Sequence, residues 1–318
     1  MADHINRLKL ITSFPEYRSS DFNEEIYNRQ FRENNVIIKA NSGNVSFPEH
    51  WGPLSIKCSS GGKENYIVGS RFYTVHENNF LVLNEGQYYS SYIYSDQKVS
   101  SFTINFNSAI QHEVACSYFN NDEKNINNPG LTENRQLIFT ERLYEESDDV
   151  IPVMEKLKNL SDDFKNEYAR IEELLYLLLG KLVSIEKRLI HEINKVDVLK
   201  PSTRSELYKR LYFVKDYLDS SYHHDITLND MASVANLNGA YLLRKFKNYF
   251  SITPRQYIIK KRMEAAAKLL QTTGFSITEV CNEVGYSDLA SFGKLFKQFY
   301  HLPPEKYRMC KKTHKTEI

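Results

Sequence analysis

The chain of 318 residues has few cysteines, and they are not clustered. Cys58, Cys116, Cys281 and Cys310 are spread along the sequence and form no C-x-x-C pair. Zinc sites and disulfide frameworks need cysteines at short, regular spacings, so we interpret all four as reduced structural thiols. We therefore expect no metal site built on cysteine and no fold held together by disulfides.

The sequence also lacks a long hydrophobic run. The longest, residues 174–179, is far shorter than the roughly 20 apolar residues that a membrane-spanning helix needs. The first ten residues mix His4, Arg7 and Lys9 with apolar residues and contain no hydrophobic segment of a signal peptide. We expect a cytoplasmic protein with no membrane partner.

The formal net charge of +1 conceals an asymmetry between the two parts of the chain. Residues 1–204 carry 23 Lys and Arg against 29 Asp and Glu, whereas residues 205–318 carry 18 against 11. A basic segment beside an acidic one indicates that only the C-terminal part contacts a polyanion. Because many basic domains bind no nucleic acid, this interpretation needs a motif to support it.

The first half of the chain is typical of short strands separated by turns. Residues 41–44, 59–62, 78–79 and 84–86 are rich in Asn, Ser and Gly, which favour turns. This spacing predicts an antiparallel β-sandwich or small barrel within residues 1–150. The predicted strands, rich in β-branched and aromatic residues, are Val36–Lys39, Leu54–Cys58, Tyr66–Val68, Phe80–Leu83, Tyr88–Tyr94 and Ser101–Phe106.

From residue 151 the hydrophobic period becomes helical. Pro201 and its polar neighbours predict a linker at 195–204, which separates a helical segment at 151–194 from a helical domain at 205–310. The first helix of that domain should end near Ser220 and Ser221. The apolar stripe of the first segment consists of Leu174, Leu175, Leu178, Leu182, Ile185, Leu189 and Ile193.

The C-terminal domain contains an internal repeat. Residues 228–237 align with residues 277–286 at an offset of 49, and an insertion near Asp288 then raises the offset to 50. Fixed-offset self-similarity indicates that one supersecondary unit is used twice. Beyond the insertion, the matching pairs are Phe246-Lys247 with Phe296-Lys297, Pro254 with Pro304, and Tyr257 with Tyr307.

Each copy meets the requirements of a helix-turn-helix unit, at 227–247 and at 276–297. A capping residue begins each first helix, and an acidic residue follows three positions later: Thr227 with Asp230, and Ser276 with Glu279. The helices can cross closely at Ala232 and Cys281, and the turns fall at Asn236 and Gly285, which tolerate the left-handed conformation. The second helices should begin near Asn238 and Asp288 and bury Leu242, Phe246, Phe292 and Phe296. Two matches with shared trailing residues favour this unit over a generic helical bundle.

Residues 206–308, about a third of the chain, resemble the DNA-binding domain of AraC/XylS-family transcriptional regulators. Ser251 and His301 depart from the pattern, because the family usually has glycine at these positions. The residues that carry the resemblance are Tyr241 to Lys247, Thr253 to Tyr257, Arg262-Met263, Ala266, Leu269-Leu270, Ser276-Ile277, Val284 to Asp288, Phe292, Leu295 to Lys297, Pro304 and Tyr307-Arg308.

The resemblance implies a multidomain α+β fold with a specific division of labour. The N-terminal part would be a β-rich, cupin-like barrel with helices, and the C-terminal part an all-α domain with two helix-turn-helix units. A connecting helix at 254–273 would place the two second helices in successive segments of the major groove of double-stranded DNA, about 34 Å apart. Further implied partners are RNA polymerase and a second copy of the chain in a homodimer.

The family pattern also implies which side chains contact DNA. Arg244 is the strongest candidate, since bidentate arginine to guanine is the commonest specific contact, although a surface salt bridge is the alternative. The second helix presents mostly small or apolar side chains, so we expect it to read thymine methyl groups or DNA shape, or to bind weakly. The candidates are Ala240, Tyr241, Leu243, Arg244, Lys245 and Lys247 in the first unit, and Ser287, Leu289, Ala290, Gly293, Lys294 and Lys297 in the second.

In the family, a β-rich N-terminal domain of this length usually senses a small molecule and dimerises through adjacent helices. The stripe at residues 174–193 would be the dimer seam, or it would pack on its own barrel. The aromatic residues that could line an effector pocket are Trp51, Tyr73, Phe80, Tyr88, Tyr92 and Phe102.

The histidines of the β-rich part do not support an enzyme. His50, His76 and His112 are far apart and form no H-x-H pair, whereas an enzymatic cupin needs two or three histidines and a carboxylate around a metal. We therefore expect no catalytic residue, no metal and no cofactor. The leading hypothesis is an effector-controlled transcription activator. The alternatives are a regulator whose N-terminal domain only dimerises or binds a protein, and a cupin-type metalloenzyme.

Overall fold

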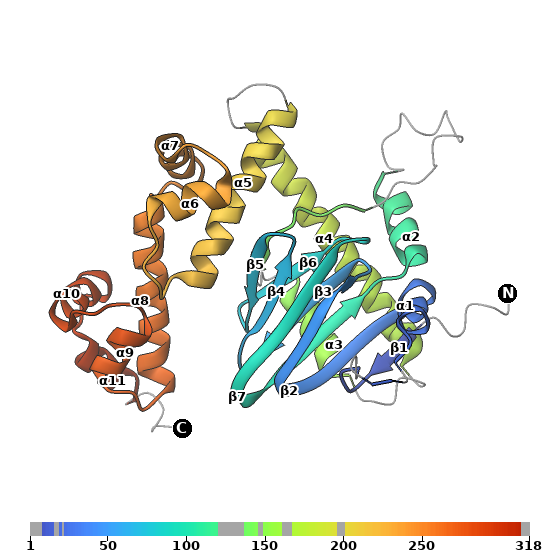
Figure 1. Ribbon diagram of the computed structural model, residues 1–318, viewed down its shortest axis with the longest axis horizontal. Helices are drawn as coiled ribbons and strands as arrows, with labels where there is room; N and C mark the ends of the chain where they lie inside the picture. The colour runs from blue at the N-terminus through green and yellow to red at the C-terminus, as the bar shows by residue number, and fades with distance from the viewer. Residues whose placement is uncertain are drawn as a thin grey trace. The chain divides into compact units, whose positions relative to one another are not determined.

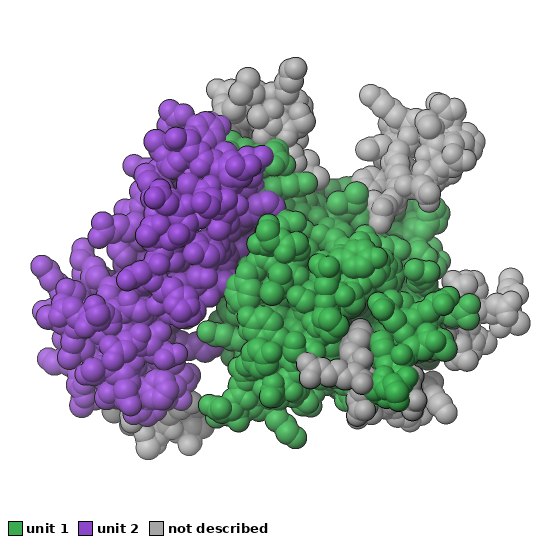
Figure 2. Space-filling view, in the orientation of Figure 1, with its two compact units in different colours: residues 1–209 green, residues 210–318 purple. Residues whose placement is uncertain are grey.

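The computed structural model describes residues 8–15, 19–20, 22–119, 137–145, 149–160, 167–195 and 201–312, with backbone alone for 119, 190–195, 201–205 and 310–312. The chain divides into two compact units, residues 1–209 and residues 210–318 (Figure 2). Within the described residues, no helix combines the length and the hydropathy needed to span a membrane.

The first unit is built on an eight-stranded sheet (Figure 1). The main order of strands is β1-β2-β7-β3-β6-β8, and β4 pairs with both β5 and β7. All pairs are antiparallel except β1 with β2. The strands are β1 (Leu8–Ile11), β2 (Asn35–Trp51), β3 (Ser55–Ser60), β4 (Glu64–Val68), β5 (Arg71–Val75), β6 (Asn79–Leu83), β7 (Tyr88–Asn105) and β8 (Leu143–Glu145).

Strand β7 is the central strand of this sheet, because it is hydrogen-bonded along both edges. One edge pairs with β2, from Tyr88 to Asn105. The other edge pairs with β4 at residues 90–92 and with β3 at residues 100–105. The β-rich N-terminal fold is thus confirmed. Among the described pairings, β1 and β8 remain at the two ends of the path, so the ladder does not show the closed barrel that a cupin-like fold implies.

Two local predictions in this sheet are wrong. The predicted turn at residues 41–44 is part of β2, where the pairing register shifts between Ser42 and Asn44. The separate strands predicted at 88–94 and 101–106 are parts of the single strand β7. In both places cross-strand pairing overrides the local preference for a turn, and a bulge absorbs the irregularity.

Helices cover one face of the sheet, and the apolar stripe of α4 (Tyr168–Lys195) lies in their core. Leu174, Leu178 and Leu182 are buried in one cluster with Ile56 and Ile104 of the sheet. Burial of each such side chain contributes about 1.5–3 kcal/mol. The stripe therefore packs on its own sheet rather than forming the predicted dimer seam; the side chain of Ile193 lies outside the described residues. The other helices of this unit are α1 (Glu24–Glu33), α2 (Ser108–Phe119) and α3 (Ile151–Lys158).

The predicted linker at 195–204 is shorter than expected. Helix α4 continues to Lys195, and α5 (Pro201–Ser221) already begins at Pro201, so residues 201–204 are helical. Proline suits the first turn of a helix because its fixed φ is helical and no N–H is needed there. Residues 196–200 lie outside the described residues.

The second unit is helical, and α8 connects its two halves (Figure 1). Leu242 and Phe246 are fully buried in the first half, and Phe292 and Phe296 are fully buried in the second, as predicted. The helices that follow α5 are α6 (Leu228–Ala235), α7 (Gly239–Phe250), α8 (Pro254–Thr272), α9 (Ile277–Glu283), α10 (Leu289–Tyr300) and α11 (Pro304–Lys312).

A buried carboxylate connects α5 to α8. Asp219 accepts a hydrogen bond from the Tyr257 hydroxyl at 2.7 Å and forms ion pairs with Lys215 and Lys261, each at 3.0 Å. Burial would raise the pKa of the Asp219 carboxyl, but the two lysines and the hydrogen bonds outweigh it and hold the pKa below its usual value. The cluster therefore stabilises the contact between these two helices while the carboxyl is ionised.

The residues that directly follow α7 and α10 have the same unusual backbone. Ser251 and His301 both lie in the left-handed region, at φ 62° and 61°. These are the two positions at which the AraC/XylS pattern usually has glycine. The turn geometry is therefore kept without glycine, although a left-handed residue with a Cβ costs about 1–2 kcal/mol.

We expect Asp219→Asn to lower the free energy of unfolding of the helical unit by about 3 kcal/mol, because it leaves buried Lys215 and half-buried Lys261 without their counter-charge. The folded pKa is below the unfolded value of about 4, so this contribution is present above that value and is lost as the pH falls through the folded pKa. Urea unfolding followed by circular dichroism at several pH values should show a weaker acid dependence in the variant. An unchanged acid dependence would contradict the assignment.

We expect Ser251→Gly and His301→Gly each to raise the free energy of unfolding by about 0.5–1 kcal/mol, since glycine removes the left-handed penalty but also loses more backbone entropy on folding. Gln298→Gly is the matched control, because exposed Gln298 lies within α10. Glycine there should instead lower stability by about 0.5–1 kcal/mol. Equal effects at all three positions in urea unfolding would show that the left-handed backbone is not the cause.

Candidate nucleic-acid interface and interior cavity

The first helix-turn-helix unit is fixed by side chains at its helix ends. Thr227 accepts a hydrogen bond from the Asp230 backbone N–H at 3.2 Å, and the Asp230 carboxylate accepts from the Thr227 N–H at 2.8 Å. Asn236 ends α6 in the left-handed conformation, at φ 48°. The Asn238 side chain then accepts from the N–H groups of Ala240 and Tyr241 and begins α7. Local sequence thus sets the entry and exit of both helices.

The second helix-turn-helix unit has the same kinds of helix caps and turn. Ser276 and Glu279 form the capping box of α9, and Asp288 accepts from the backbone N–H groups at the start of α10. The turn at Gly285 has φ 87°, and a Cβ there would lie 2.5 Å from the carbonyl oxygen of His223. Hydrogen bonds from Ser291 hold the pKa of the Asp288 carboxyl below its usual value. A negatively charged cap suits the positive end of the helix dipole.

Arg262 of α8 holds the second turn against the end of α5. Its guanidinium donates to the carbonyl oxygens of Tyr222 and Gly285, both at 2.7 Å, and of His224 at 2.9 Å. It also lies 5.0 Å from the centre of the Tyr286 ring. One side chain of α8 therefore joins the segment that follows α5 to the turn that precedes α10.

The predicted contact residues of α7 lie on its exposed side. Ala240, Leu243, Arg244 and Lys247 are exposed, whereas Tyr241 and Lys245 are half-buried. The Arg244 guanidinium lies 5.5 Å from the centre of the Tyr241 ring. Among the described residues, Arg244 has no carboxylate partner within 4.0 Å, so its guanidinium is not in the salt bridge that was the alternative.

The exposed side of α10 is less charged. Ser287, Ala290, Lys294 and Lys297 are exposed, and Leu289 keeps 45% of its surface exposed. Gly293 is half-buried, but a Cβ added there would meet no atom within 4 Å. Packing within the chain therefore does not require this glycine, although glycine inside a helix costs about 1 kcal/mol relative to alanine.

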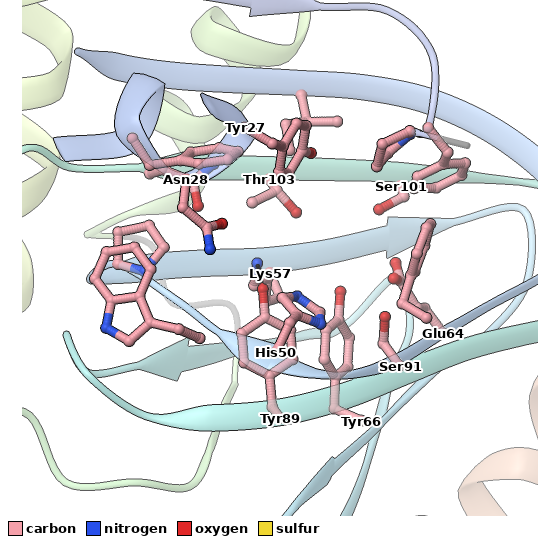
Figure 3. Close-up of a pocket in the computed structure, with 18 residues that line it drawn as sticks. Tyr27, Asn28, His50, Lys57, Glu64, Tyr66, Tyr89, Ser91, Ser101 and Thr103 are labelled. Atoms are coloured by element: carbon pink, nitrogen blue, oxygen red, sulfur yellow. Dashed lines mark hydrogen bonds between the residues drawn. The ribbon is translucent and has the colours of Figure 1, made fainter. Parts of the chain in front are cut away.

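The first unit contains an interior cavity on the face of the sheet opposite α4 (Figure 3). Strands β2, β3, β4 and β7 form its floor. Further lining side chains are those of Phe14, Pro15, Tyr27, Asn28 and Phe31. Counted to its open mouth, the space between the lining atoms is about 560 Å³, but the centres of water-sized molecules can occupy only about 60 Å³ of it.

Only one of the six predicted ligand residues lines this cavity. Trp51 does, at the end of β2. Phe80 and Phe102 point to the opposite face and belong to the core with α4, because alternate strand residues face opposite sides. Tyr73 is buried and donates to Glu141, Tyr88 is exposed, and Tyr92 contacts Phe72 and Tyr94.

The polar lining of the cavity was not predicted from the sequence. Lys57 and Glu64 are buried, and Lys57 donates to the Tyr89 hydroxyl at 2.8 Å. Burial lowers the pKa of Lys57 to about 8 and raises the pKa of Glu64. The available signal was a lysine in the middle of β3, whose residues are otherwise apolar or small. A buried charge of this kind is expensive and points to a specific role.

The structure brings together no metal site among the residues it describes. No group of three or more His, Cys, Asp or Glu side chains is placed there to hold a metal ion. His50 lines the cavity, His76 contacts Asn79, and His112 contacts Cys116. The three histidines therefore have different local surroundings.

Comparisons with known proteins place the helical unit among regulators. A helix-turn-helix domain family matches residues 231–309. The Msm operon regulatory protein of Streptococcus mutans is 30% identical over 132 residues, which cover 42% of this chain and 47% of that protein. The raffinose operon transcriptional regulatory protein of Pediococcus pentosaceus is 34% identical over 92 residues, covering 29% of this chain and 33% of that protein. This chain thus spans less than half the length of these two relatives.

Solved structures also match this part of the chain. The C-terminal domain of the response regulator yesN from Fusobacterium nucleatum is 33% identical, with a TM-score of 0.29, and the match covers 30% of this chain and 93% of that chain. The two relatives above are named as operon regulators. With the repeated caps, turns and buried aromatic residues, these matches show that the C-terminal part of the chain is a helix-turn-helix domain similar to those of transcriptional regulators.

Proposed function

We propose that this protein is a sequence-specific transcription regulator that reads two neighbouring major-groove segments with α7 and α10. The observation that supports the proposal is the duplicated unit: two helices with equivalent caps and turns each present an exposed side. The major groove admits a helix and displays a distinct pattern for every base pair. Two recognition helices in one rigidly connected domain would read sites about one DNA turn, or 34 Å, apart.

The two helices would read DNA differently. The Arg244 guanidinium, which has no carboxylate partner among the described residues, would bond guanine in a bidentate manner. Leu289, Ala290 and Gly293 carry no polar side-chain group, so α10 would contact thymine methyl groups or follow DNA shape. Lys245, Lys247, Lys294 and Lys297 would contact phosphates, which position a protein without specifying sequence.

The cavity of the first unit would bind a small effector and thereby control this DNA-binding activity. Binding can shift a conformational equilibrium only if the two states differ in affinity for the ligand. The resemblance to the family further predicts action in the cytoplasm as a homodimer with RNA polymerase as a partner. The dimer would use a surface other than the buried stripe of α4. The two relatives described above are named as regulators and not as enzymes, in keeping with a chain that carries out no catalysis.

The Arg244 contact can be tested by selecting binding sites for the full-length chain from a randomised duplex pool. We expect two conserved blocks about one helical turn apart for the wild-type protein. Arg244→Ala should weaken one block by about 1–3 kcal/mol per lost contact. Arg244→Lys keeps the charge but loses the planar fork, so it should retain general affinity and still lose that preference.

Lys247→Ala is the control for a phosphate contact. It should lower affinity similarly for all sequences and reduce the salt dependence by about one unit of slope, with an unchanged consensus. Equal binding of all duplexes by the wild-type chain would refute sequence-specific recognition. A consensus unaffected by Arg244→Ala would refute only the role of this residue.

Gly293 provides a second test, because stability and DNA binding should change in opposite directions. Gly293→Ala should raise the free energy of unfolding by up to about 1 kcal/mol, since a methyl group meets no atom there. It should also lower affinity for the selected site at least about fivefold if the helix backbone approaches DNA at this point. Gln298→Ala, on the same helix, should leave affinity unchanged. Unchanged affinity in Gly293→Ala would show that DNA does not approach this position.

A further inference from the structure

The cavity of the first unit holds two opposite charges that do not pair with each other. Lys57 is 4% exposed and Glu64 is 3% exposed, and both line the cavity. Both residues are described by the structure, and no ion pair within 4.0 Å joins them. The two groups attract each other through the cavity, but no direct ion pair offsets the cost of burying them, so this arrangement needs an explanation.

Each charge keeps unused bonding capacity. The Lys57 ammonium has three N–H donors, and its one hydrogen bond to a described residue goes to the Tyr89 hydroxyl. Ser101 and Tyr66 form hydrogen bonds with the Glu64 carboxylate, but its oxygen Oε2 is buried and has no hydrogen-bond partner among the described residues. In Figure 3, Lys57 and Glu64 lie on the same side of the cavity, together with the side chains of Tyr66 and Tyr89. The cavity therefore offers both a cationic donor and an anionic acceptor.

The rest of the wall combines aromatic side chains with polar ones such as Asn28, Ser101 and Thr103. Phe14, Phe31, Phe47 and Trp51 line it, and the rings of Phe14 and Phe47 are 5.3 Å apart. His50 adds little positive charge near neutral pH, because burial lowers its pKa. The space for water-sized molecules is only about 60 Å³, so a larger occupant would have to displace side chains near the mouth.

We propose that this cavity binds a small dipolar molecule with both an ammonium and a carboxylate group, such as an amino acid with an apolar side chain. Lys57 would contact the carboxylate, Glu64 would contact the ammonium, and the aromatic wall would receive the side chain. A purely anionic ligand would leave Glu64 uncompensated, and a purely cationic one would leave Lys57 uncompensated. A ligand without any charged group would supply a counter-charge to neither Lys57 nor Glu64. The inference rests on the proposed role of this unit in effector binding.

The single tryptophan of the chain makes a direct test possible, because Trp51 lines the cavity. The full-length protein is titrated with L-leucine, L-methionine and L-phenylalanine while its tryptophan fluorescence is recorded. The matched analogues are N-acetyl-L-phenylalanine, which lacks the cation, and L-phenylalaninamide, which lacks the anion. We expect at least one of the amino acids to bind, and phenylalanine to bind at least about tenfold more tightly than either analogue if it is the one accepted. For leucine or methionine, the corresponding analogues are compared.

Variants then assign the two contacts. Glu64→Gln should remove the preference over the analogue without a cation, and Lys57→Met should remove the preference over the analogue without an anion. Glu49→Gln and Lys98→Met are matched controls, because both residues are exposed on the same sheet. If Lys57→Met does not fold, Tyr89→Phe serves instead, since it removes the one described acceptor of the Lys57 ammonium and should change affinity at least about threefold.

The outcomes separate this inference from the proposed function. Charge-dependent binding that is lost in the two variants and kept in the controls would support a dipolar ligand. Binding of the single-charge analogues alone, or of no probe by a protein that still selects DNA, would overturn the inference and leave the regulator intact. Amino-acid binding without any selection of DNA would instead refute the proposed function while the ligand class stood.

Discussion

The three hydrogen bonds of Arg262 determine how the helical unit holds together. A helix-turn-helix unit of two short helices buries too little surface to be stable alone, so its position depends on what it packs against. Arg262 joins the connecting helix to the end of α5 and to the turn that begins at Gly285. The Asp219 cluster performs a similar task between α5 and the start of α8. The second helix-turn-helix unit is thereby attached to two helices that are themselves joined.

This attachment explains why the turn at Gly285 is more constrained than the turn at Asn236. Both residues have positive φ, which asparagine tolerates and glycine adopts freely. Only at Gly285 does the neighbouring backbone, at His223, occupy the space of a side chain. The two copies therefore share a conformation but differ in the residues that this conformation permits.

The helical unit could be predicted from the sequence in detail because its determinants are local. Capping residues, left-handed turn residues and buried aromatic positions all act within a few residues of one another, and the repeat presents them twice. The fold of the first unit was predicted only in outline. The register of β2 with β7 joins residues far apart in the sequence, and this pairing converted the turn expected at 41–44 into a bulge.

The lining of the cavity was even harder to predict from the sequence than the strand register. Aromatic residues were chosen by type, but the faces of Phe80 and Phe102 depend on strand register, which sets every second side chain on the same side. The charged residues Lys57 and Glu64 were missed because the sequence does not show that two separate strands place them in one buried space. Of the six predicted aromatic residues only Trp51 lines the cavity, and one aromatic side chain does not define a site.

Strand β7 couples the cavity to the core mechanically, because its two rows of side chains face these two different parts of the unit. Ser101 and Thr103 line the cavity, whereas Phe102 and Ile104, which alternate with them, pack in the core with α4. A strand that is hydrogen-bonded on both edges moves as one body, so its two rows cannot shift independently. Any displacement of β7 by an occupant of the cavity would therefore also move the side chains that pack against α4.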